Sequence, residues 1–233
     1  MKSLGTIFSD FTSLVFPDCC YGCNQCLVSG EEIICTKCRL DLPKTKHAAN
    51  VDNVLKLRFQ GRIDFKYAIS YAKYTKSGVV GRLLRELKYH GITEIGELLG
   101  EWLGHEMLEN GYANAFDAII PVPLHKRKES RRGYNQATVF AESLAKVLEI
   151  DLLNDAVIRT KFTQSQTNFS GEARWENVKD IFQVMDPATI QNRRILLADD
   201  VVTTGATIEE LANEILKYKP MELSLVTIAD ADH

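Results

Sequence analysis

The stretch Ile195–Thr207, ILLADDVVTTGAT, decides the fold. Its first residues form an apolar run that is typical of a buried β-strand, and a helical pattern extends from Thr207 to Tyr218. Two adjacent carboxylates, Asp199 and Asp200, stand at the predicted end of the strand, and a short loop of small residues follows them. Because ligands of open parallel sheets bind beyond the carboxyl ends of the strands, this pattern predicts a binding site at that edge.

The loop has the chemistry of a phosphate site. Backbone N–H groups at the start of a helix converge on anions, and Gly205 allows close approach. The hydroxyls of the neighbouring threonines add donors, while the two carboxylates can accept hydrogen bonds from a diol or hold hydrated Mg²⁺. Together these groups describe a ribose 5-phosphate. An ordinary strand-turn-helix is the alternative, but two adjacent acids would then cost stability, and the sequence has no G-x-x-x-x-G-K-[ST] loop.

Strands and helices alternate along the rest of the chain. This predicts an α/β fold, a mostly parallel sheet with helices on both faces. Residues 44–60 are interpreted as a polar linker, and the polar segment 160–180 as an active-site flap. The predicted strands cover residues 66–74, 117–122, 194–199 and 222–228, and the predicted helices cover residues 79–89, 94–108, 136–148 and 207–218.

A basic segment follows the strand that ends near Val122. Five of the seven residues from Lys126 to Arg132 are cations, and their position predicts a loop at the same sheet edge as Asp199. Such a cluster would neutralise an anion such as pyrophosphate, with Lys88 as a further cation. A solvated loop is one alternative. Binding of nucleic-acid phosphates, with Tyr134 stacked on a base, is another.

All six cysteines lie between Cys19 and Cys38. Two C-x-x-C pairs, Cys20 with Cys23 and Cys35 with Cys38, suit a structural zinc ion held by four thiolates. Cys23-x-x-Cys26 is an alternative first pair, and a redox motif is a second alternative.

The remaining composition is ordinary. The net charge of −3 does not favour nucleic acid over other partners, so any anion site must be local. No apolar run is long enough to cross a membrane, and the N-terminus lacks a secretory signal pattern. Apolar residues at helical spacing between Leu4 and Val15 predict a short helix packed on its own domain. We therefore expect a cytoplasmic protein.

The stretch quoted above resembles the signature of type I phosphoribosyltransferases, which bind 5-phosphoribosyl-1-pyrophosphate (PRPP) with Mg²⁺. The resemblance implies that Asp199 and Asp200 bind the ribose hydroxyls and that residues 203–207 bind the 5′-phosphate. Asp199, Asp200, Arg131 and Arg132 are the expected catalytic residues. The expected PRPP-binding residues are Lys88, Lys126, Arg127, Asp199, Asp200, Val201, Val202, Thr203, Thr204, Gly205, Ala206 and Thr207.

Over nearly its full length the chain resembles the competence protein F (ComF) family, which joins an N-terminal zinc ribbon to a phosphoribosyltransferase domain. The resemblance divides the chain into residues 1–60 and 61–233 and selects Cys20, Cys23, Cys35 and Cys38 as zinc ligands. Cys19 and Cys26 are additional thiols, and Phe169 stands where the family pattern suggests Leu. The motifs that carry the resemblance are the cysteine pairs, Leu87-Lys88-Tyr89, Pro121–Leu124, Arg131–Gln136, Asp199–Thr207, and Gln166, Arg174 and Asn177 in the flap.

The family resemblance implies a role in DNA uptake during natural transformation. It implies handling of single-stranded DNA on the cytoplasmic side, with a helicase-like partner. Transfer of phosphoribosyl to an acceptor that the sequence does not name is the first hypothesis. A PRPP-sensing or DNA-binding module without turnover is the second, and a scaffold that docks a partner is the third.

Overall fold

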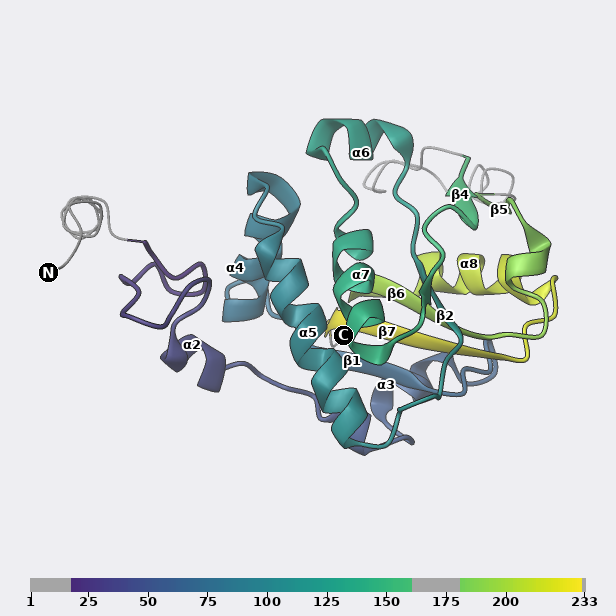
Figure 1. The fold of residues 1–233 in the computed structure, drawn as a ribbon, viewed down its shortest axis with the longest axis horizontal. Coiled ribbons are helices and arrows are strands. Elements are labelled where there is room, and N and C mark those ends of the chain that lie inside the picture. Colours follow the sequence, from purple (N-terminus) through teal and green to yellow (C-terminus); the bar gives the residue numbers. More distant parts are fainter. Residues whose placement is uncertain (1–17, 161–180, 232–233) are drawn as a thin grey trace, which may run out of the picture.

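The computed structural model describes residues 18–160 and 181–231, and five parallel strands form its central sheet (Figure 1). The strand order is β1-β7-β6-β2-β3, as the alternating pattern predicts for a parallel sheet. A separate antiparallel pair, β4 and β5, stands beside it. The strands are β1 (Ala68–Lys73), β2 (Ala118–Pro121), β3 (Asp151–Leu152), β4 (Val157–Arg159), β5 (Phe182–Val184), β6 (Arg194–Val202) and β7 (Glu222–Asp230).

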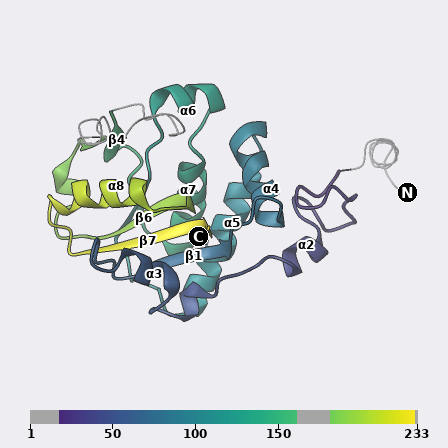
Figure 2. The same cartoon turned by 180° about the vertical axis from the view of Figure 1, so that it is seen from behind.

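Helices cover both faces of the sheet, as predicted (Figures 1 and 2). The helices α4 (Val79–Arg85), α5 (Glu94–Glu109) and α7 (Gln136–Leu148) pack on one face. The helices α3 (Val54–Phe59) and α8 (Ala206–Leu216) pack on the other, together with β4 and β5. The two central strands, β6 and β7, are therefore buried on both sides, which explains their nearly continuous apolar sequence.

The elements around the site agree closely with the sequence prediction. The bounds of α7 are those predicted, and α4 continues into a single π-helical turn, Glu86–His90, that carries Lys88. Strand β6 runs three residues further than predicted, because its pairing with β7 continues to Val202 opposite Asp230. Asp199 and Asp200 therefore lie inside the strand, not after its end.

Two segments that we expected to be irregular are helical. The predicted linker over residues 44–60 is wrong, because it contains a 3₁₀ turn (His47–Ala49) and α3, whose Leu55 and Phe59 are fully buried. Asn53 caps α3 by accepting hydrogen bonds from its first amides. The predicted basic loop is the short helix α6 (Lys126–Arg132), which begins after the His125 cap and ends at Gly133.

The cysteine-rich residues 18–42 form a module that includes helix α2 (Thr36–Leu40) and packs against α4 (Figure 1). A last 3₁₀ turn, η3 (Pro187–Thr189), precedes β6. The division of the chain at residue 60 stays a prediction. The expected N-terminal helix and the flap residues Gln166, Arg174 and Asn177 lie outside the described residues. Within residues 18–160 and 181–231, no helix combines the length and apolar character needed to cross a bilayer.

Candidate functional site

The two adjacent acids of β6 point to opposite faces of the sheet, because side chains alternate along a strand. Asp200 is buried on the α4 side, and its Oδ2 lies 2.9 Å from Nζ of Lys88. Asp199 is partly exposed on the α8 side, where it interacts electrostatically with Arg159 at the end of β4. The structure thus brings Lys88 to the acidic pair, and it adds Arg159, which the sequence did not single out.

The ionised form of Asp199 is disfavoured in the folded protein. Burial and the nearby charge of Asp200 raise the pKa of Asp199 from 3.8 to about 7, although Lys88 and Arg159 act in the opposite direction. Two acids this close cannot both ionise freely without a compensating cation. The arrangement therefore favours a bound cation or hydrogen-bond donor at this position.

The small-residue loop surrounds a hollow at the start of α8. Residues Asp199 and Val201–Ile208 line this hollow, which has a volume of about 50 Å³. Thr203 and Thr204 are exposed there, and the backbone reaches the helix through Gly205, which has φ +81°. The first amides of a helix thus border a small polar space, which is the geometry that binds a phosphate group.

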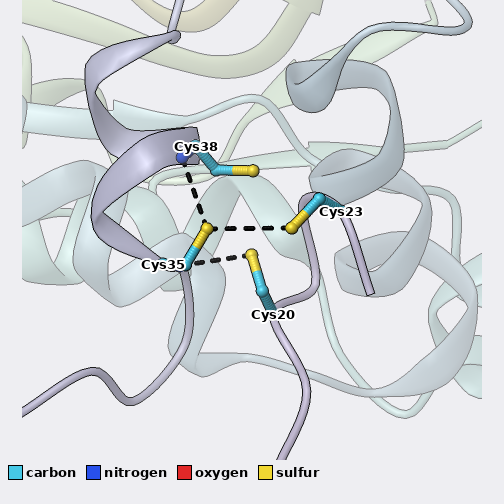
Figure 3. Close-up of side chains that lie close together, drawn as sticks. All are labelled: Cys20, Cys23, Cys35 and Cys38. Atoms are coloured by element: carbon cyan, nitrogen blue, oxygen red, sulfur yellow. Dashed lines mark hydrogen bonds between the residues drawn. The ribbon is translucent and has the colours of Figure 1, made fainter. Parts of the chain in front are cut away.

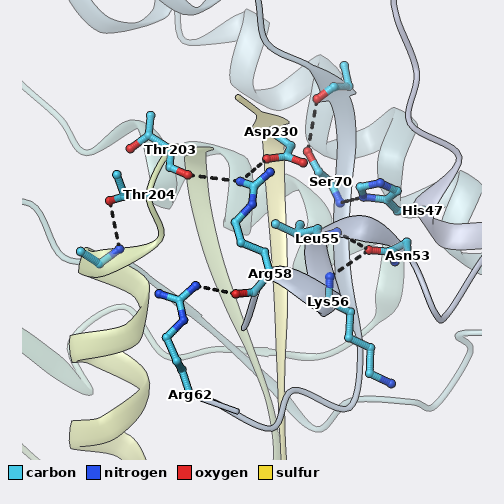
Figure 4. Close-up of polar contacts among 12 residues, drawn as sticks. His47, Asn53, Leu55, Lys56, Arg58, Arg62, Ser70, Thr203, Thr204 and Asp230 are labelled. Carbon is cyan, nitrogen blue, oxygen red and sulfur yellow. Dashed lines mark hydrogen bonds and ion pairs between the residues drawn. The ribbon is translucent and has the colours of Figure 1, made fainter. Parts of the chain in front are cut away.

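Helix α3 supports this loop from the side (Figure 4). Arg58 donates one hydrogen bond to the carbonyl of Thr203 at 3.2 Å and another to Oδ1 of the buried Asp230 at 2.6 Å. Arg62 pairs with Glu209 in the first turn of α8 at 2.8 Å. The segment predicted to be a linker therefore holds the phosphate loop in place, and its role was missed because its apolar residues are few and irregularly spaced.

Gly205 should be the least replaceable residue of the loop. A Cβ atom there would lie 2.7 Å from the ring of Phe59, in addition to the strain of its positive φ. We expect Gly205→Ala to destabilise the protein by about 2–4 kcal/mol in urea denaturation. Gly133→Ala is the matched control, because Gly133 has φ +86° but no atom within 4 Å of the added carbon. It should cost about 1 kcal/mol, and equal costs for the two variants would contradict the contact with Phe59.

Cations gather on one face of α6 and beside it. Lys128 and the two arginines one turn later, Arg131 and Arg132, share this face. Partial burial together with the charges of Arg159, Arg132, Arg131 and Lys88 lowers the pKa of Lys128. Mutual repulsion of this kind is relieved by a multivalent anion. Lys128 was not among the predicted binding residues, although its spacing from Arg131 and Arg132 could have indicated it.

The other predicted members of the basic segment are placed differently. Lys126 and Arg127 are exposed in the first turn of α6, and their part in binding stays a prediction. The structure does not favour the alternative in which Tyr134 stacks on a base, because Tyr134 packs against the core and its hydroxyl donates to the carbonyl of Leu87. Tyr89 is the exposed ring, and the guanidinium of Arg132 lies 5.3 Å from its centre.

A second, larger hollow of about 380 Å³ opens on the Asp200 side of β6. It lies between the carboxyl ends of β1 and β6 and the helix α4 with its π turn. Asp200 therefore faces an open space, not packed protein. The lining residues used below are Lys76, Gly81, Arg85, Lys88 and Asp200.

The four cysteines of the two C-x-x-C pairs come together in the N-terminal module (Figure 3). The sulfur atoms of Cys20, Cys23, Cys35 and Cys38 all lie within 4.8 Å of one another. Backbone N–H groups donate to two of them, from Cys35 to the sulfur of Cys20 at 3.2 Å and from Cys38 to that of Cys35 at 3.4 Å. Burial would raise the pKa of Cys20, but donors from Cys35, Cys23 and Gly22 outweigh it and bring the pKa to about 7.

This donor set fits a tetrahedral metal ion. Zinc–sulfur bonds of about 2.3 Å place the sulfur atoms of a tetrahedron about 3.8 Å apart, and those of Cys23 and Cys35 are 3.7 Å apart. Cys19 and Cys26 lie outside the cluster, where they face each other across a short antiparallel bridge. The alternative pair Cys23-x-x-Cys26 is therefore not the one that the structure assembles.

A parallel sheet whose central strand carries an acidic pair and leads into a phosphate loop defines a protein with the phosphoribosyltransferase fold. In agreement, a family model described as "Phosphoribosyl transferase domain" matches residues 135–233. With its four-cysteine module, the chain belongs to the competence protein F family.

Three relatives support this assignment. The chain is 30% identical to "DNA utilization protein YhgH" of Escherichia coli over 219 residues, 88% of this chain and 93% of that protein. It is 27% identical to "Competence protein ComFC" of Bacillus subtilis over 214 residues, 90% of this chain and 82% of that protein. It is 38% identical to "Competence protein F" of Haemophilus influenzae over 116 residues, which span 49% of this chain and about half, 51%, of that protein.

Among solved structures, a hypoxanthine phosphoribosyltransferase from Staphylococcus aureus is similar with a TM-score of 0.39 and 16% identity. The similarity covers 59% of this chain and 64% of that one. A similarity of this size supports no residue-by-residue comparison.

Proposed function

We propose that the carboxyl edge of the sheet binds PRPP with Mg²⁺ and transfers its phosphoribosyl group to an acceptor. One observation carries this proposal: Asp199 and Asp200 lie on the strand that leads directly into a phosphate-sized hollow. Asp199 and the loop residues line the same hollow, so one ribose could present a hydroxyl to the acid and its 5′-phosphate to the amides.

In this reaction the bond between C1 of the ribose and a pyrophosphate oxygen breaks, and the acceptor forms the new bond to C1. Negative charge grows on the departing pyrophosphate, and Lys128, Arg131 and Arg132 are grouped where they can stabilise it. Bound Mg²⁺ would supply additional positive charge for the same leaving group. Asp199, which lines the phosphate hollow, would orient the ribose. The hollow of about 380 Å³ beside Asp200 leaves room for the acceptor.

Isothermal titration with PRPP tests the first step. We expect binding in the presence of Mg²⁺, weaker binding in its absence, and competition by ribose 5-phosphate. Release of pyrophosphate in the presence of an acceptor then measures turnover. Absence of PRPP binding at millimolar concentrations would refute the proposal, while binding without pyrophosphate release with any acceptor would favour a sensor.

A second function is favoured by the exposed side of α6. None of its residues is buried, and the exposed Tyr89 ring beside Arg132 could stack on a base. The names of the relatives refer to competence and DNA utilization. We accordingly propose a role in handling single-stranded DNA in the cytoplasm, together with a helicase-like partner. An oligonucleotide added to the same titration should bind with an affinity that falls steeply with salt.

For the cysteine module we propose structural zinc. The four thiolates would fill all coordination positions of the ion and leave none open for a substrate.

A further inference from the structure

We propose that Arg82 is a positioning residue that couples the metal-binding module to the turn lining the hollow beside Asp200. This role goes beyond the proposed reaction, because it concerns how the module controls the shape of the site. Arg82 lies in α4, between the module and the sheet, and its guanidinium hydrogen-bonds to one carbonyl on each side.

On the module side, the partner of Arg82 is part of the metal cluster. Its Nε donates to the carbonyl of Gly22, which stands between Cys20 and Cys23. The N–H of Gly22 donates to the sulfur of Cys20 at 3.3 Å. A Cβ atom on Gly22 would lie 3.0 Å from the sulfur of Cys38, so this peptide has little freedom while the four sulfurs are held together.

On the site side, the partner is the turn between β1 and α4, residues 74–78. Nη1 of Arg82 donates to the carbonyl of Ser77 at 2.8 Å. The turn packs tightly on the helix, because a Cβ atom on Gly81 would lie 2.3 Å from the carbonyl oxygen of Thr75 and 2.7 Å from that of Lys76. Lys76 and Gly81 both line the hollow that also contains Asp200 and Lys88.

The planar guanidinium makes this link rigid. Its donors have a fixed relative geometry, so the two carbonyls cannot move independently while both bonds are present. Loss of the metal would leave nothing to hold the four sulfur atoms together, and the Gly22 peptide, whose N–H donates to the sulfur of Cys20, would be free to move. Arg82 would then lose one partner, and the turn at residues 74–78 would open more often.

Hydrogen exchange measured by mass spectrometry tests the coupling directly. The full-length protein is compared in its metal-loaded form and after treatment with a chelator, in peptides covering residues 74–90. In the wild type we expect metal removal to speed exchange of the turn several-fold. In Arg82→Met, and also in Arg82→Lys, which cannot bridge both carbonyls in the same geometry, exchange should be fast with the metal bound and rise no further.

Arg39→Met is the matched control. Arg39 also fastens the module to the main sheet domain, because its guanidinium lies 4.7 Å from the ring centre of Trp102 in α5, but no described contact joins it to the turn. This variant should respond to metal removal as the wild type does. An unchanged exchange rate in wild-type residues 74–78 on metal removal would overturn the proposal, as would a wild-type response in Arg82→Met.

Metal content is measured in every variant first. If the metal stabilises the turn through Arg82, the intact link must equally strengthen metal binding. Weaker metal binding by Arg82→Met than by Arg39→Met would therefore also support the coupling. Equal loss in both variants would overturn it, since the effect would then belong to docking of the module in general. PRPP takes no part in these measurements, so failure of the proposed reaction and failure of this coupling are distinguishable.

Discussion

Asp199→Asn should weaken PRPP binding by about 10-fold or more and at the same time make the protein more stable at pH 8. The carboxylate is the expected partner of a ribose hydroxyl, and loss of charged hydrogen bonds of about 1.5–3 kcal/mol each would weaken binding by roughly 10–100-fold or more. The ionised side chain is disfavoured in the folded state, so a neutral amide of the same shape should stabilise it. We expect a gain of about 1–3 kcal/mol, which allows for the partial exposure of Asp199.

The raised pKa of Asp199 determines how the stability difference between the wild type and Asp199→Asn changes with pH. The folded pKa of Asp199 is raised from 3.8 to about 7, so between these values the folded protein holds a proton that the unfolded chain releases. The wild type therefore loses stability as the pH rises towards 7. The Asp199→Asn variant does not, because its amide does not titrate. The advantage of Asp199→Asn in thermal denaturation should be largest at pH 8 and shrink steadily towards pH 5.

Asp200→Asn is the control with the opposite effect on stability. Asp200 is buried and paired with Lys88, so its neutralisation removes the charge of this ion pair and should destabilise the protein while also weakening PRPP binding. The electrostatic account would be wrong if both variants shifted the melting temperature in the same direction.

Cys38→Ser should release the metal and unfold the module over residues 18–42. The module has few buried apolar side chains besides its cysteines, among them Ile34 and Leu42, so we expect its folding to depend on the metal. Structural zinc contributes about 10–16 kcal/mol in isolated zinc fingers, far more than such a small core. Metal analysis and limited proteolysis should show one metal ion per wild-type chain, none in the variant, and rapid cleavage within residues 18–42.

Cys26→Ser tests whether this effect is specific. Cys26 is exposed and lies outside the four-sulfur cluster, so its replacement should leave both the metal content and the protease resistance unchanged. Retention of the metal by Cys38→Ser together with its loss from Cys26→Ser would show that the ligand set is wrong.

Local patterns were enough to predict most of the scaffold. The apolar run of β6, the spacing of α7 and the two C-x-x-C pairs are signals that depend on neighbours along the chain. The parallel arrangement then placed Asp199 and the α6 cations at the same edge, because parallel strands end on the same side. For that reason the sequence alone was enough to predict these features.

The partners of the acidic pair needed the folded chain. Arg159 and Arg58 have no distinguishing neighbours in sequence, and they reach the site only because β4 and α3 pack around the end of β6. The opposite orientations of Asp199 and Asp200 depend on how far β6 pairs with β7, which is a long-range property. Spacing along the chain therefore indicated the candidate groups, whereas tertiary packing decided which of them come together. Contacts between distant segments leave no periodic pattern in the sequence from which they could be predicted.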